Sequence, residues 1–188
     1  MKIAQDHYLI IDLEATCADD KSISSREMEI IEIGAVLLNS QTLNVESEYQ
    51  TFIKPILHPS LTEFCRSLTS ISQENVDSAP LFPDALKQFQ SWLYPFSSYL
   101  FCSWGNYDRN QIQQDCKLYN LGYPFPGGHM NLKQEFSTVM GLKKKQGMAG
   151  ALYHLGLELE GTHHRGIDDA RNIARIVQAV MARMNSEE

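Results

Sequence analysis

The sequence lacks several features that would assign it to a membrane or secreted class. No apolar run in its 188 residues approaches the roughly 20 residues that a membrane-spanning helix needs. The first ten residues, MKIAQDHYLI, lack the basic-then-apolar plan of a signal peptide. We also find no internal repeat, low-complexity tract or linker. We therefore expect a cytoplasmic protein whose residues 1–188 form a single domain, with no membrane segment.

Cysteine is scarce and widely spaced. The chain holds four cysteines and no CxxC pair, which argues against a zinc site and against a redox motif. We expect reduced, mostly buried thiols at Cys17, Cys65, Cys102 and Cys116.

Positive charge is also in short supply. The chain has 16 Lys and Arg residues against 23 Asp and Glu residues, a net charge of -7. This balance argues against a broad basic surface for duplex nucleic acid but permits a small site that recruits cations. One dense basic run, Lys143 to Lys145, reads first as a solvated loop, and the alternative is an electrostatic guide for an incoming strand.

The informative stretch is YLIIDLEAT, residues 8–16. Its apolar run predicts a central strand buried on both faces, which Asp12 and Glu14 interrupt. Because side chains alternate along a strand, these two carboxylates share one face about 7 Å apart. A divalent cation between them would relieve their repulsion, which predicts half of a metal site. The alternative is that both residues only mark where the strand leaves the core.

The remaining pattern predicts a mixed sheet covered by helices. Residues 29–38 and 45–53 should complete a three-stranded antiparallel meander in which the middle strands flank the first. A further strand is expected at 99–104 and an extended piece at 129–132. Helices are expected at 60–67, 73–76 with Ser72 as cap, 82–93, 107–120, 132–139, 148–155 and 168–184.

More candidate site residues follow later in the chain. Asp108 opens a helix after the strand at 99–104, where N-capping offers a competing explanation. His164 lies on a loop, and Asp168 and Asp169 open the last helix. Capping could explain one of these aspartates but not the histidine and the second carboxylate, a pair that suits general-base work beside a metal.

The assembled set predicts a hard-cation site. Four carboxylates (Asp12, Glu14, Asp108 and Asp169) with no thiolate select Mg²⁺ or Mn²⁺ over Zn²⁺. Two such ions about 4 Å apart suit in-line phosphoryl displacement, with His164 taking a proton from the attacking water.

These residues carry a resemblance to a known family. DLEAT, then YD at Asp108, then a histidine, four residues and Asp169 resemble the DEDDh branch of the DnaQ-like 3′-5′ exonucleases. Within it the chain is similar to exoribonucleases related to the histone-mRNA and small-interfering-RNA trimming enzyme. The similarity extends from Tyr8 to about Ala179 and includes DLEATC, EIIEIGAVLL, FCRSLTSISQENVDSAP, SWGNYD and GIDDARNIARI.

The resemblance implies an α/β, RNase H-like fold, with a five-stranded mixed sheet and helices on both faces. It also implies that the four carboxylates bind two Mg²⁺ (Mn²⁺ is the alternative) and that His164 is the general base. His163 would leave five intervening residues before Asp169 instead of the family's four.

The family's nucleotide contacts can be carried over in the same way. The resemblance places Phe64 and Tyr107 on either side of the 3′-terminal base, although two core aromatics are the plain alternative. It places Leu68 and Thr69 along the terminal nucleotide and Ala15 near its 3′-hydroxyl. Where relatives have Trp and Gly, this chain has Tyr107 and Ser70.

The sequence thus predicts a metal-dependent 3′-5′ exonuclease that acts on single-stranded 3′ ends, RNA more than DNA, and releases nucleoside 5′-monophosphates. A DNA-directed, proofreading-type exonuclease and a non-catalytic nucleic-acid-binding module are the alternatives. We expect no additional N-terminal nucleic-acid-binding segment. The sequence leaves the oligomeric state open.

Overall fold

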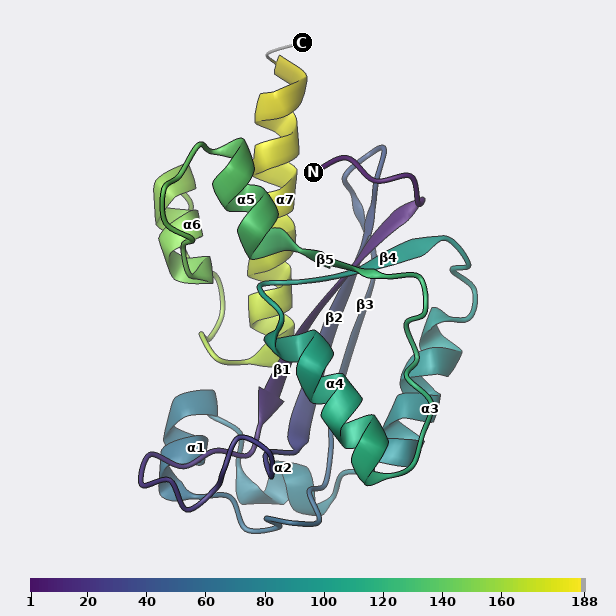
Figure 1. The fold of residues 1–188 in the computed structure, drawn as a ribbon, viewed down its shortest axis with the longest axis vertical. Helices are drawn as coiled ribbons and strands as arrows, with labels where there is room; N and C mark the ends of the chain where they lie inside the picture. Colours follow the sequence, from purple (N-terminus) through teal and green to yellow (C-terminus); the bar gives the residue numbers. More distant parts are fainter. Residues whose placement is uncertain (187–188) are drawn as a thin grey trace.

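The computed structural model describes residues 1–186 and contains a five-stranded sheet in the order β3-β2-β1-β4-β5 (Figure 1). The strands are β1 (His7–Ala15), β2 (Ile30–Asn39), β3 (Val45–Phe52), β4 (Tyr99–Ser103) and β5 (His129–Asn131). The helices are α1 (Glu63–Thr69), α2 (Gln73–Asp77), α3 (Phe82–Leu93), α4 (Tyr107–Leu118), α5 (Leu132–Val139), α6 (Met148–Leu155) and α7 (Gly166–Ser186).

Strand β1 lies at the centre of the sheet, as its unbroken apolar run predicts. It pairs antiparallel with β2 on one side and parallel with β4 on the other. The antiparallel meander of β1, β2 and β3 is confirmed, but the expectation that the middle strands both flank β1 is wrong. β3 pairs with β2, and the later strand β4 takes the second edge of β1 because a βαβ-type crossover places it there in parallel.

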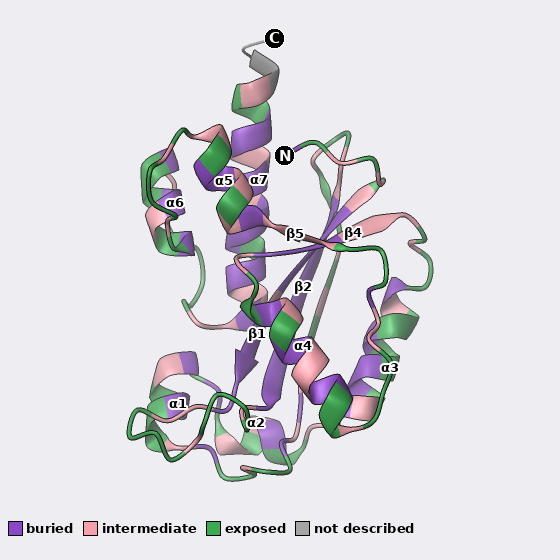
Figure 2. Cartoon of the chain, viewed as in Figure 1, coloured by how far each residue is buried: buried purple, intermediate pink, exposed green. Residues whose placement is uncertain are grey.

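Helices cover both faces of the sheet, which confirms the predicted mixed α/β architecture. One apolar cluster joins Tyr8 and Ile10 of β1 to helices α5, α6 and α7. The other joins Leu9, Ile11 and Leu13 to helices α3 and α4. In Figure 2 the central strands are buried along their length, and the helices turn their buried sides toward them. Strand alternation therefore fixes which residues of β1 face α7.

Most predicted elements form within a few residues of their expected bounds. Helix α1 begins at Glu63, because the Thr62 hydroxyl caps it by accepting a hydrogen bond from the Cys65 amide at 2.9 Å. Ser72 caps α2 as predicted, in a reciprocal capping box with Asn75. The last helix begins two residues earlier than expected, at Gly166.

Two glycines allow α7 to approach the sheet closely. A methyl group built on Gly34 of β2 would lie 2.1 Å from the backbone carbon of Gly166. One built on Gly166 would lie 2.9 Å from the carbonyl oxygen of Asp12. The first turn of α7 thus rests directly on the backbone of β1 and β2.

Two further features concern the cysteines and the length of the helices. All four cysteines are free, and three of them are buried. Within residues 1–186, no helix combines the length and the apolar character needed to cross a membrane.

Candidate active site

Three carboxylates converge where β1 leaves the core. Asp12 and Glu14 continue the alternation of Tyr8 and Ile10, so they point toward the face that α7 covers. Asp169 reaches them from the first turn of α7. Oxygen atoms of Asp12, Glu14 and Asp169 all lie within 4.8 Å of one another, a spacing that a shared cation would bridge.

Asp108 joins this group from the other side of β1. Asn106 occupies the N-cap position of α4, and Asp108 is the second residue of the helix, within its first turn. Its Oδ1 atom accepts a hydrogen bond from the Leu13 amide at 3.1 Å. Asp108 is therefore not the N-cap residue, although its charge still lies in the first turn of the helix, and its carboxylate is bound to β1 between the two acidic residues of that strand.

The carboxylates destabilise one another's charge. Burial, followed by repulsion from Asp108 and Asp169, raises the pKa of Asp12 well above its usual range. Burial and the charge of Asp169 raise the pKa of Glu14 to about 8, and burial raises the pKa of Asp108 to about 6. A bound divalent cation would reverse these shifts, because it compensates the negative charge.

Two adjacent histidines contact Asp169 in different ways. The Nδ1 atom of His163 lies 3.0 Å from the Asp169 carboxylate, whereas His164 donates its backbone amide to that carboxylate at 3.0 Å. Their rings are stacked, with centroids 4.0 Å apart. His164 has a φ of 62°, so its backbone adopts the left-handed conformation, which is uncommon for residues other than glycine.

The ring of His164 is available for proton transfer. No hydrogen bond joins this ring to another residue in the described part of the chain, unlike the ring of His163. Burial, and the neighbouring His163 to a lesser degree, lower the pKa of His164 below its ordinary value. Its imidazole is therefore neutral near pH 7 and can accept a proton.

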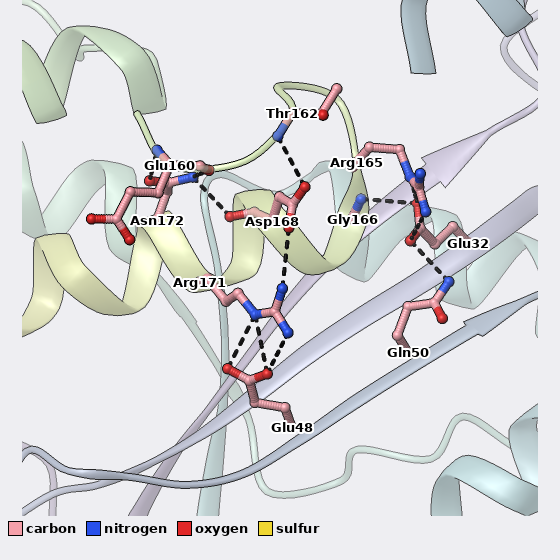
Figure 3. Close-up of polar contacts among 10 residues, drawn as sticks. All are labelled: Glu32, Glu48, Gln50, Glu160, Thr162, Arg165, Gly166, Asp168, Arg171 and Asn172. Atoms are coloured by element: carbon pink, nitrogen blue, oxygen red, sulfur yellow. Dashed lines mark hydrogen bonds and ion pairs between the residues drawn. The ribbon is translucent and has the colours of Figure 1, made fainter. Parts of the chain in front are cut away.

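The loop that carries both histidines is fixed on both sides (Figure 3). Before them, Asp168 accepts the Thr162 amide at 2.9 Å and pairs with Arg171 at 3.2 Å. After them, the Arg165 guanidinium donates to Glu32 at 3.1 and 3.3 Å.

Glu32 is a fifth acidic residue next to the site. It is fully buried, pairs in register with Glu14 across β1 and β2, and also accepts the Gly166 amide at 3.0 Å. The sequence pattern gave Glu32 no role in the site, and the spacing to Asp169 favoured His164 over His163 as the base. The available signals were a glutamate inside the apolar run EIIEIGAVLL and a second histidine beside His164.

A cavity of about 390 Å³ joins these groups. It is lined by Asp12, Glu14, Asp108, Asp169 and both histidines, and by Leu13, Ala15, Cys17, Met28, Leu68, Trp104, Tyr107, Gly147 and Met148. The structure thus brings all five predicted catalytic residues to one cavity.

The predicted nucleotide-contacting residues divide into two groups. Ala15, Leu68 and Tyr107 line the cavity, and Tyr107 is 45% exposed. Phe64 is 38% exposed on α1 but does not line the cavity. Thr69 is fully buried and does not line the cavity, and its hydroxyl donates to the Cys65 carbonyl at 2.8 Å, so its contact with the terminal nucleotide stays a prediction.

The chain matches a family of known proteins over most of its length. The family model described as exonuclease (RNase T) matches residues 9–177. The human protein named 3'-5' exoribonuclease 1 is 35% identical over 181 residues, which cover 91% of this chain and 51% of that protein. The chain spans about half the length of the curated relatives it matches.

Solved structures agree with this match. The crystal structure of the nuclease domain of 3'hExo, a DEDDh family member bound to rAMP, has a TM-score of 0.89 and 33% identity, and the match covers 98% of this chain and 95% of that one. A structure described as 3'-end specific recognition of histone mRNA stem-loop by 3'-exonuclease has a TM-score of 0.88 and 32% identity, covering 95% of this chain and 65% of that one. The shared architecture is the RNase H-like fold that the resemblance implied.

Proposed function

We propose that this chain trims single-stranded RNA from the 3′ end and releases nucleoside 5′-monophosphates. The premise of this proposal is that the chain belongs to the exonuclease family and, within it, to the DEDDh 3′-5′ exoribonucleases. Residues 1–188 would act as one exonuclease domain. The observation that carries the proposal is the convergence of Asp12, Glu14 and Asp169 within 4.8 Å, with Asp108 and His164 in the same cavity.

The donor set fits two hard divalent cations, Mg²⁺ or Mn²⁺. Asp12, Glu14, Asp108 and Asp169 would hold them, because carboxylate oxygens without thiolates favour such ions. When bound, the ions would polarise the scissile phosphate and favour deprotonation of the attacking water.

His164 would act as the general base. Its neutral ring can take the proton from the attacking water, while its backbone amide holds Asp169. His163 would orient Asp169 through its own ring, as partners of metal-binding carboxylates commonly do. His164 would therefore serve proton transfer, and His163 would serve metal binding through Asp169.

The terminal nucleoside would lie against Ala15, Leu68 and Tyr107. Apolar and aromatic surfaces accept the face of any base, which suits removal of nucleotides without sequence preference. Phe64 would reach this base from the exposed side of α1. Thr69 would support α1 from within, since its hydroxyl is bound to the helix backbone.

A direct test is digestion of single-stranded RNA, single-stranded DNA and a stem-loop with a 3′ overhang, each carrying a 5′ label and of matched sequence. We expect stepwise shortening of RNA from the 3′ end, loss of activity with EDTA, and loss of activity in Asp12→Asn and Asp108→Asn. Neither substitution changes side-chain volume, and both variants should keep the wild-type circular dichroism spectrum. If the protein digests DNA faster than RNA, DNA is the preferred substrate and the RNA assignment is wrong. Activity that persists in EDTA would contradict the proposed metal site.

The two histidines can be separated by substitution. His164→Ala should lower kcat by about 10² to 10⁴, as loss of a general base typically does, while Mg²⁺ affinity measured by calorimetry changes little. His163→Ala should weaken Mg²⁺ binding more than His164→Ala does, because it releases Asp169. Equal kcat values in wild type and His164→Ala at pH 7 would exclude the assigned base.

A further inference from the structure

The cavity extends between two helices that lie on opposite sides of the carboxylates. Leu68 belongs to α1 and Met148 to α6, and both line the cavity. In Figure 1, α1 lies beyond the end of β1 and α6 lies beside α7, with the segment that leads from α6 into α7 between them. Asp12 and Glu14, near the end of β1, and Asp169, at the start of α7, line the same cavity with their oxygens within 4.8 Å of one another.

The chemistry of the strand then sets its direction. In the proposed function, the terminal nucleoside lies toward α1 and its 5′-phosphate lies at the carboxylates. The next nucleotide toward the 5′ end is joined to that same phosphate, so it must continue beyond the carboxylates. The continuing strand therefore passes the α6 end, where Trp104, Gly147 and Met148 line the cavity.

Trp104 and the loop before α6 form one unit at this end. The indole Nε1 atom donates to the carbonyl of Gln146 at 3.1 Å, and the ring packs on Phe136 with centroids 5.7 Å apart. These contacts hold the loop against the end of β4. The loop backbone is therefore anchored at Gln146, next to the three lysines.

The lysines of this loop are placed to meet phosphates. Lys143, Lys144 and Lys145 are all exposed, and no ion pair with an acidic residue involves them in the described part of the chain. Lys145 precedes the cavity-lining Gly147 by two residues, a span of at most about 7 Å of extended chain. The exposed side chain of Lys145 therefore starts close to the cavity edge, and its flexible stem lets the ammonium group reach the phosphates of a strand that leaves the cavity.

We infer that Trp104 and Lys143 to Lys145 form a binding surface for the upstream nucleotides of the single strand being digested. The lysines contact phosphates, and the half-buried, cavity-lining ring of Trp104 contacts the base or sugar next to the scissile bond. This inference rests on the proposed function and deepens it by assigning where the strand outside the active site lies. In a chain of net charge -7, such a local cationic surface would offset repulsion of the incoming phosphates.

The test compares a substrate that has an upstream strand with one that has none. The triple variant Lys143→Gln, Lys144→Gln, Lys145→Gln is assayed on a 20-nucleotide RNA and on the p-nitrophenyl ester of uridine 5′-monophosphate. A control variant carries the same loss of charge at three other exposed lysines: Lys21→Gln, Lys87→Gln and Lys117→Gln. The wild-type protein and both variants are assayed between 50 and 200 mM salt.

We expect the loop variant to raise KM for the long RNA about 10-fold, with hydrolysis of the ester unchanged. Its slope of log(kcat/KM) against log[salt] should be smaller by about 2, since each phosphate contact on a single strand contributes about 0.7. The control variant should keep the wild-type KM and slope to within about twofold.

The outcomes separate the two proposals. If the loop and control variants change KM and the salt slope for RNA equally, the inference is overturned. Wild-type activity on RNA and on the ester would still support the proposed function in that case. Wild-type protein that hydrolyses neither substrate would overturn the proposed function itself. A loop variant that loses activity on the ester as well would also contradict the inference, because the lysines would then act on the terminal nucleotide.

Discussion

Removing the guanidinium of Arg165 should destabilise the fold and the histidine loop together. The side chain of Glu32 has no exposed surface, and that of Arg165 is 24% exposed. In Arg165→Met, the carboxylate keeps the neutral donors of Gly166 at 3.0 Å and Gln50 at 3.1 Å but loses its counter-charge. It also lies across the strand pair from Glu14, which adds a like charge.

The cost follows from the burial of this ion pair. Leaving one partner of a buried pair uncompensated costs about 3–5 kcal/mol, and the partial exposure of Arg165 places the expected loss at about 3 kcal/mol. This loss is a large part of the roughly 5–15 kcal/mol that stabilises an ordinary domain. Urea unfolding at pH 7, followed by circular dichroism, measures it directly.

A double variant tests the reasoning. Adding Glu32→Gln to Arg165→Met removes the uncompensated charge and keeps an oxygen that can accept the Gly166 amide. The double variant should recover at least 1–2 kcal/mol of the roughly 3 kcal/mol lost. A single variant that loses less than about 1 kcal/mol, or a double variant less stable than the single one, would refute the charge-compensation argument.

Three other predictions concern the site and its packing. Gly34→Ala should lower the free energy of unfolding in urea by at least about 1–3 kcal/mol, because the added methyl group would meet the backbone of Gly166. The control Gly122→Ala should leave the free energy of unfolding nearly unchanged, because the space around Gly122 is open. In EDTA, the free energy of unfolding should fall as pH rises from about 4.5 to about 8. Burial raises the pKa of Glu14 from 4.5 to about 8, so in this range the folded state binds more protons than the unfolded chain does. Unfolding midpoints at pH 5.5 and 8 measure this slope, and a flat or rising profile would contradict it. Added Mg²⁺ should raise the unfolding midpoint of the protein more at pH 8 than at pH 5.5. Asp12→Asn should raise the metal-free unfolding midpoint at pH 8, since it removes one repelling charge, and an unchanged or lower midpoint would show that the charges are already compensated.

The strands and the shared direction of Asp12 and Glu14 could be predicted because they depend on local alternation. The same period that buries Tyr8 and Ile10 toward α7 also turns both carboxylates that way. Capping chemistry likewise predicted α2 from Ser72. Local rules suffice for such features, because each depends on residues a few positions apart.

The role of Glu32 could not be predicted in this way. In the sequence it is one polar residue within an apolar strand, and its partner Arg165 lies 133 positions later. The same holds for β3, whose pairing with β2 alone depends on the arrangement of the whole sheet. The inward direction of the Thr69 side chain could not be predicted either, because sequence similarity identifies the segment near a ligand but not which way each side chain of a short helix points.

The contact between Gly34 and Gly166 has a consequence for how the site comes into existence. A slip of one residue along α7 would rotate Asp169 by about 100° around the helix axis and carry it away from Asp12. Cation binding and docking of the last helix are therefore expected to be one cooperative event. An intermediate that retains the sheet but has released α7 would keep Asp12 and Glu14 but lose Asp169, so it should bind Mg²⁺ more weakly than the folded protein does.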